Sequence, residues 1–127
     1  MNEPSSKNIA GIILRVGLGL VMLWFGTSQL GNASQWVGYL PSWVGSLPIS
    51  SITFVHMNGW FELVFGSLLI LGFYTRIIAF VLTLHLFSIA VTVGYNEIGV
   101  RDFGLSMSLL ALVFAGGGDW SLDHYFK

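Results

Sequence analysis

Cysteine is absent from the 127-residue sequence, which excludes disulfide bonds, thiolate metal ligands, an iron–sulfur cluster and a thiol nucleophile. Charge is scarce as well, since Lys, Arg, Asp and Glu together make up 9% of the chain. Soluble domains carry about a quarter charged residues, so this surface could not be kept in water. The few scattered basic residues exclude a nucleic-acid-binding protein, which needs a basic patch. Hydrophobic residues make up 54% of the chain, and this composition predicts an integral membrane protein.

Four long apolar runs take up most of the chain. A membrane-spanning helix needs about 20 mostly apolar residues, at about 1.5 Å of rise each. We therefore expect spans at residues 9–30, 52–72, 77–94 and 100–117, with an outer interfacial loop at 31–51. These runs predict an all-α fold, a four-helix bundle that forms a single transmembrane domain over residues 1–127.

The basic residues of the short connections indicate an orientation. Lys7 precedes the first span, Arg76 separates the second from the third, and Lys127 ends the chain. An even number of spans places all three on one side, so we expect both termini in the cytoplasm and a multi-pass protein of a prokaryotic plasma membrane. We expect the first span to be retained and not cleaved as a signal peptide, because its apolar run is long and contains Arg15.

The outer loop contains an internal repeat. The segment Trp36–Pro41 recurs seven residues later as Trp43–Pro48. Tryptophan and tyrosine favour the membrane interface, and the prolines prevent one continuous helix. Interfacial anchoring is the commoner use of such aromatics, and a lid over a cavity in the bundle is the alternative.

Each expected span has a stripe of polar or small residues at helical spacing. The stripe of the first span consists of Gly11, Arg15, Gly19, Met22, Gly26 and Gln29. The others consist of Asn58, Gly59, Glu62 and Gly66, then His85, Ser88, Thr92 and Asn96, and finally Asp102 and Ser106. Polar side chains within a span face the bundle interior, and glycines allow close approach, so the stripes predict a polar seam.

Depth along the spans predicts which polar groups meet. Counted from the span ends at about 1.5 Å per residue, Arg15 lies about 9 Å deep and Glu62 about 15 Å deep. We expect Arg15 to pair with Glu62, with His85 close enough to join them. Such a group is either functional or a buried ion pair that only sets helix register.

A second polar cluster is expected near the outer face, continuous with the first through Asn58 and Glu62. Its members are Gln29, His56, Asn58, Arg101 and Asp102. Arg101 and Asp102 are expected to form an interfacial pair at a helix start. A haem is not expected, because His56 and His85 lie at different levels, and no metal is expected, because no metal-binding histidine spacing is present.

Three passages together resemble a known family. They are the L-R-V-G-L-G-L to L-W-F-G run over 14–26, the E…G…LL…G…TR pattern over 62–76, and the G-G-G-D-W-S-L-D close over 116–123. All three are similar to DoxX-type membrane proteins, small four-helix proteins that include the small subunit of thiosulfate:quinone oxidoreductase. The resemblance implies a membrane subunit that works with quinone and a partner protein. It marks these positions as important: Arg15, Glu62, Arg76, Trp120 and Asp123.

One stretch departs from the family pattern. Where the family often has histidine and then lysine at the end of the first span, this chain has Phe25 and Gln29. Proton or anion handling by those two residues is therefore not expected here.

The leading hypothesis is an integral membrane subunit of a quinone-linked oxidoreductase that is inactive alone. Glu62, Arg15 and His85 would then be the catalytic residues. Ring contacts to quinone are expected from Trp24, Phe25, Phe61 and Phe65. The alternative is a non-catalytic anchor or assembly factor for a soluble redox enzyme, and a small carrier ranks third. We expect membrane lipids and either a protein partner or further copies of the chain as partners.

Overall fold

Four long helices make up most of the structure, a computed structural model that describes residues 6–118 and 121–126. They are α1 (Ser6–Gly31), α3 (Ser51–Leu71), α4 (Thr75–Val93) and α5 (Glu97–Ala115). The short elements are α2 (Ala33–Trp36), η1 (Val37–Tyr39), η2 (Ser42–Ser46) and α6 (Leu122–Tyr125). Each long helix is long and apolar enough to cross a membrane, which confirms the all-α, four-span expectation. The orientation across the membrane stays a prediction. Trp120 and Lys127 lie outside the described residues.

Polar side chains and glycines set the helix ends. The Ser50 hydroxyl accepts the Thr53 N–H at 3.1 Å and so begins α3, while the Asn96 side chain accepts the Gly99 N–H at 2.9 Å and begins α5. These contacts satisfy backbone donors that the first turn of a helix leaves open. Gly72 ends α3 at φ 73°, a left-handed conformation that favours glycine.

The first hairpin consists of α1 and α3, which pack antiparallel through glycine. A Cβ on Gly26 would lie 2.8 Å from the Gly59 carbonyl oxygen, and a Cβ on Gly66 would lie 2.9 Å from the Met22 Cβ. The two backbones therefore approach more closely than any side chain would allow. The contacts fix the register, because Gly26 lies opposite Gly59 and Gly19 lies opposite Gly66.

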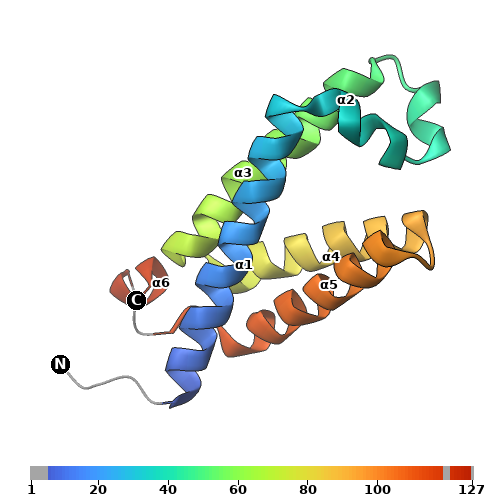
Figure 1. The fold of residues 1–127 in the computed structure, drawn as a ribbon. Coiled ribbons are helices and arrows are strands. Elements are labelled where there is room, and N and C mark those ends of the chain that lie inside the picture. The colour runs from blue at the N-terminus through green and yellow to red at the C-terminus, as the bar shows by residue number, and fades with distance from the viewer. Residues whose placement is uncertain (1–5, 119–120, 127) are drawn as a thin grey trace.

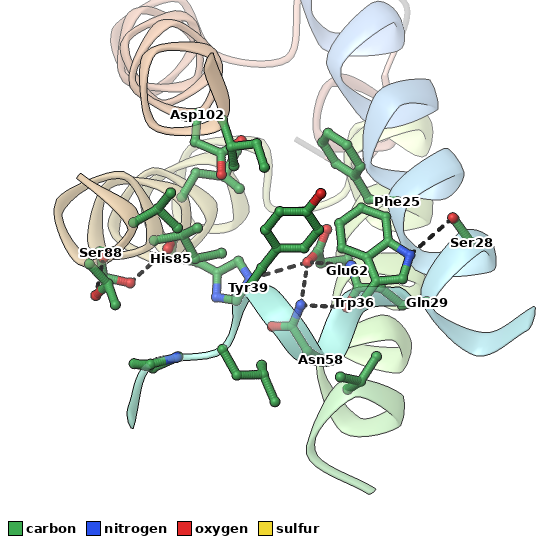
Figure 2. Close-up of a pocket in the computed structure, with 18 of the residues that line it drawn as sticks. Phe25, Ser28, Gln29, Trp36, Tyr39, Asn58, Glu62, His85, Ser88 and Asp102 are labelled. Carbon is green, nitrogen blue, oxygen red and sulfur yellow. Dashed lines mark hydrogen bonds and ion pairs between the residues drawn. The ribbon is translucent and has the colours of Figure 1, made fainter. Parts of the chain in front are cut away.

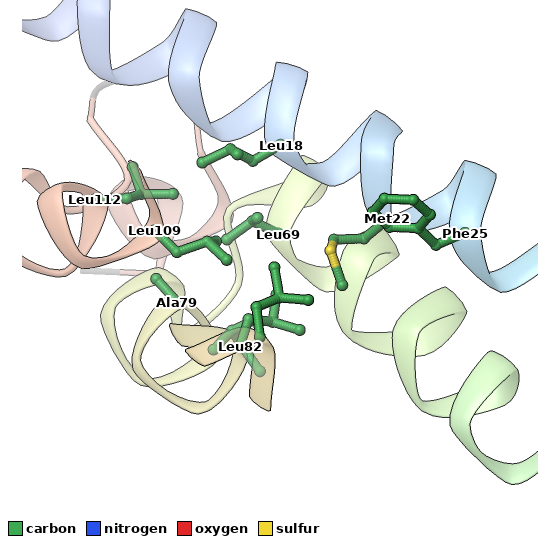
Figure 3. Close-up of a cluster of buried hydrophobic side chains, with 10 residues drawn as sticks. Leu18, Met22, Phe25, Leu69, Ala79, Leu82, Leu109 and Leu112 are labelled. Atoms are coloured by element: carbon green, nitrogen blue, oxygen red, sulfur yellow. The ribbon is translucent and has the colours of Figure 1, made fainter. Parts of the chain in front are cut away.

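The second hairpin consists of α4 and α5, joined by a short turn at 94–96. The two hairpins converge at the end that carries the start of α1, the α3–α4 turn and α6, which we call the termini end (Figure 1). They diverge toward the other, loop end. The convergent region holds a packed apolar core (Figure 3) of Leu18, Met22, Phe25, Leu69, Ile78, Ala79, Leu82, Leu86, Leu109 and Leu112.

The last described segment folds back onto the α3–α4 turn. The Asp123 carboxylate accepts the backbone N–H groups of Tyr74 and Thr75, and the Asp123 N–H donates to the Gly72 carbonyl at 2.9 Å. A Cβ on Gly117 would lie 2.7 Å from Thr75 Oγ1. The passages over 62–76 and 116–123, which carry part of the family resemblance, therefore contact one another at the termini end.

Candidate functional site

A cavity of about 800 Å³ lies between the diverging hairpins. Its wall combines aromatic rings with ionisable side chains, a mixture typical of ligand sites. The aromatic lining consists of Trp24, Phe25, Trp36, Tyr39, Trp43 and Phe54. The ionisable lining, apart from tyrosine, consists of Glu62, His85, Glu97, Arg101 and Asp102.

Glu62 of α3 is the centre of a hydrogen-bond network in this cavity, and its side chain is almost fully buried (Figure 2). Its Oε1 accepts the Asn58 Nδ2 amide at 2.6 Å and the Gln29 Nε2 amide at 3.1 Å. Asn58 Nδ2 also donates to Gln29 Oε1 at 2.6 Å. The His85 ring nitrogen Nε2 lies 3.4 Å from the same carboxylate oxygen. Glu62 thus links both helices of the first hairpin to α4 of the second.

The second carboxylate oxygen of Glu62, Oε2, differs from Oε1 in its hydrogen bonding. Among the residues that the structure describes, Oε2 is buried and has no hydrogen-bond partner. A buried acceptor without a donor costs about 1–3 kcal/mol, so native proteins seldom leave one unsatisfied. A donor group from a ligand would satisfy it. Oε2 is therefore an unsatisfied acceptor on a residue of the cavity wall.

A second buried carboxylate, Asp102, lines the cavity from α5. Its Oδ1 accepts the Arg101 Nε–H at 3.0 Å. The Arg101 guanidinium carbon also lies 4.7 Å from the centroid of the Phe25 ring on α1, a cation–π distance. The Arg101–Asp102 pair expected at a helix start is present. Asp102 is 2% exposed and belongs to the cavity wall.

The segment from α2 to η2 covers the loop end of the cavity. Trp36 Nε1 donates to Ser28 Oγ at 3.2 Å, and the Trp36 ring packs edge-on against Phe25 at a centroid distance of 6.1 Å. Tyr39 packs edge-on against Trp36 at 6.0 Å, and both rings line the cavity together with Glu62 (Figure 2). Of the two interpretations of this loop, the lid agrees with these positions, since both tryptophan-initiated repeats contribute to the lining.

Arg15 does not pair with Glu62, so that expectation was wrong. Its Nη1 donates to the carbonyls of Leu69 and Ile70 at the end of α3. The glycine register places Arg15 opposite Ile70, eight residues and about 12 Å along α3 from Glu62. Depth counted from the span ends misjudged the level, because α1 begins at Ser6 and extends past the end of α3. Arg15 joins α1 to α3 near the termini end, away from the cavity.

The other predicted residues divide between the cavity and its surroundings. Gln29 and Asn58 of the second expected cluster join Glu62 and His85 of the first in one network, whereas Arg15 and His56 lie outside it and Arg101 and Asp102 form a separate pair in the same cavity wall. Phe61 stacks on Phe65 at a centroid distance of 4.3 Å and lies 4.7 Å from the His85 ring. Both phenylalanines lie outside the described lining and pack against the core, as a support for His85. His56 is half-buried and likewise lies outside the described lining.

Sequence reasoning did not assign Trp36, Tyr39 and Trp43 to the site. Their signal was the W-V-G-x-L-P repeat, which is equally typical of a segment at the membrane interface. Placing them in a cavity wall required knowledge of where the loop folds, which the repeat does not contain.

The comparison with protein families agrees with this architecture. The family model described as DoxX matches residues 10–95, which include most of α1, the segment from α2 to η2 that forms the lid, α3 and α4. No curated protein and no solved structure matches the chain. The matched region covers more than half of the sequence and contains Gln29, Glu62 and His85. The chain therefore belongs to the DoxX family.

Proposed function

We propose that this protein is the quinone-binding membrane subunit of an oxidoreductase. The observation that carries the proposal is the buried Glu62 Oε2, which has no partner among the described residues and lies in an aromatic-walled cavity. Quinone itself comes from the family resemblance, and the cavity supplies a test of fit. Its volume of about 800 Å³ is within the range of sites for molecules of that size.

The residues present fit a quinone ring. The ring is flat and apolar, so it suits the edge-on pair of Phe25 and Trp36. Its carbonyl oxygens are acceptors and need donors from the wall. A protonated Glu62 donates from Oε2, because the amides of Asn58 and Gln29 hold the carboxyl group through Oε1. The one unsatisfied atom of the network thus becomes the donor that a carbonyl requires.

Proton handling follows from the same contacts. Quinone accepts two electrons and two protons on reduction. The role proposed for Glu62 is to pass a proton from Oε2 to the quinone carbonyl, and the role proposed for His85, 3.4 Å from Oε1, is to return a proton to the carboxyl group. The chain has no cysteine, so no thiol of its own can supply electrons, and we assign the electron supply to a partner redox protein. Glu62 and His85 are the proposed catalytic residues, and Arg15 is not included, because it lies away from the cavity.

Quinone binding tests the proposal directly. The purified protein in lipid nanodiscs is titrated with a short-chain ubiquinone, and quenching of its five tryptophans is followed. Replacing Glu62 by Leu removes the carboxyl group and leaves no donor at the position of Oε2, whereas Gln would place an amide N–H donor there. We expect Glu62→Leu to weaken binding about tenfold, since a hydrogen bond from a buried group contributes about 1–2 kcal/mol.

Glu97→Leu is the matched control. Glu97 lines the same cavity but is exposed at the start of α5, so its loss should change affinity little. Equal quinone affinity in wild type and Glu62→Leu would remove Glu62 from the site. Recruitment of a soluble redox enzyme without any quinone binding would replace the proposal by the anchor function.

A further inference from the structure

The charge of the cavity wall fits a second class of ligand. We propose that this cavity also binds lipophilic organic cations, with the ionised Glu62 carboxylate as their counter-ion. The proposal rests on the cavity wall and not on the redox role, so the two can fail separately.

The wall has more negative than positive groups. Three carboxylates line it, Glu62, Glu97 and Asp102, whereas Arg101 is the one lysine or arginine in the described lining. Arg101 is already engaged, because it donates to Asp102 at 3.0 Å and lies over the Phe25 ring. The charge of Asp102 is therefore matched, whereas Glu62 has no lysine or arginine beside it in the described lining and has His85 at 3.4 Å, a ring that is positive only when protonated.

The contacts of Glu62 leave one side of the carboxylate open. All its donors among the described residues reach Oε1: two neutral amides, from Asn58 and Gln29, and the ring of His85. Oε2 has none among the described residues, although it is buried. An ionised carboxylate within the membrane is costly unless a positive group lies beside it. A ligand that brings a positive charge to Oε2 satisfies both the charge and the open acceptor.

The aromatic wall suits such a ligand. The faces of aromatic rings carry negative potential and attract cations, with the strongest effect for tryptophan. Trp36, Tyr39 and Phe25 line the same cavity as Glu62 (Figure 2). The wall already holds one cation in this manner, since the Arg101 guanidinium carbon lies 4.7 Å from the Phe25 centroid. An organic cation with apolar substituents would combine this attraction with burial of its apolar surface.

The protonation state of one oxygen then selects the class of ligand. A protonated Oε2 is a donor and suits a carbonyl, as the proposed function requires. An ionised Oε2 is an acceptor with negative charge and suits a cation. Both ligands occupy the same space, so we expect them to compete.

Two ions of equal shape and opposite charge test the proposal. Tetraphenylphosphonium and tetraphenylborate are titrated into the protein in nanodiscs, with protein-free nanodiscs subtracted as background. We expect saturable binding of the phosphonium ion and none of the borate. Glu62→Gln should weaken phosphonium binding about tenfold or more, whereas Glu97→Gln should change it less than about threefold.

A second variant keeps the test valid if Glu62→Gln does not fold. Tyr39→Leu removes a half-exposed ring from the lid, outside the packed core, and should weaken phosphonium binding several-fold. Equal binding of the two ions, or unchanged phosphonium affinity in the folded variants, would overturn the proposal. Phosphonium binding without quinone binding would refute the proposed function alone, and the reverse result would refute this inference alone.

Discussion

The Asp123 carboxylate accepts the backbone N–H of Thr75 at 2.7 Å, across 48 residues of chain. Tyr74, the residue that directly precedes α4, makes no side-chain cap hydrogen bond of its own and adopts a left-handed φ of 52°. Asp123 accepts the Tyr74 N–H as well, so the far end of the chain caps α4. The cap lies where the two hairpins converge, so the segment that contains Asp123 stabilises the fold at this end.

Removal of this cap should destabilise the protein. We expect Asp123→Ala to lower the free energy of unfolding by about 1–2 kcal/mol, the usual cost of losing a helix N-cap. Unfolding in mixed micelles, followed by circular dichroism, measures the loss. Asp123→Asn keeps an acceptor oxygen and should lose less. Equal stability of Asp123→Ala and wild type would mean that the cap contributes nothing.

The glycine contact between α1 and α3 should tolerate no methyl group at its closest point. A Cβ on Gly26 would lie 2.8 Å from the Gly59 carbonyl oxygen, a backbone atom that can move only with its helix. Gly26→Ala should therefore destabilise the protein by about 1–3 kcal/mol. Gly17 lies on the same helix with nothing within 4 Å of its Cβ position, so Gly17→Ala is the matched control. It should be neutral or stabilising by up to about 1 kcal/mol, and thermal unfolding distinguishes the two.

Arg15 should matter for stability and not for ligand affinity. It is buried and donates to Leu69 and Ile70 at the end of α3, where the helix dipole favours a cation. We expect Arg15→Gln to lower the unfolding free energy by about 1–3 kcal/mol. Phosphonium and quinone affinities of the folded fraction should stay unchanged. A loss of affinity at unchanged stability would instead restore the coupling between Arg15 and Glu62 that the sequence predicted.

Trp36 should affect the cavity through the lid. Trp36→Ala removes a ring that packs against Phe25 and a hydrogen bond to Ser28, so ligand affinity should fall several-fold. Trp60→Ala is the control, because Trp60 is 57% exposed on α3 and outside the described lining. Calorimetric titration with tetraphenylphosphonium measures both variants. An equal effect of the two substitutions would contradict the assignment of the lid.

The four helices were predictable because hydropathy and length suffice to define a membrane span. The helix stripes also predicted that Gln29, Asn58 and Glu62 face inward. The pairing across helices was not predictable in the same way. A stripe of glycines shows that a close contact exists, but not that Gly26 lies opposite Gly59. The register between two helices decides which side chains lie opposite one another. Because this register was not known from the sequence, the prediction of an Arg15–Glu62 pair was wrong.

Contacts through loops were the second gap. Asp123 contacts residues that lie far from it in the sequence. Trp36 contacts α1 from the loop segment that follows this helix. No helical periodicity reports such a contact. Asp102 is a related case, since a carboxylate at a helix start is typical of an exposed cap, and its burial follows from the neighbouring hairpin.

The packed core lies where the hairpins converge, while the cavity lies where they diverge. A change in the angle between the hairpins therefore has different effects on the core and on the cavity. A small change in the angle between the hairpins moves the helices little at the core and most at the loop end. Bilayer thickness acts on helix tilt, at a cost of fractions of a kcal/mol per Å of mismatch. We therefore expect the surrounding lipid to act as an effector of this protein, because the tilt of the helices changes the width of the cavity.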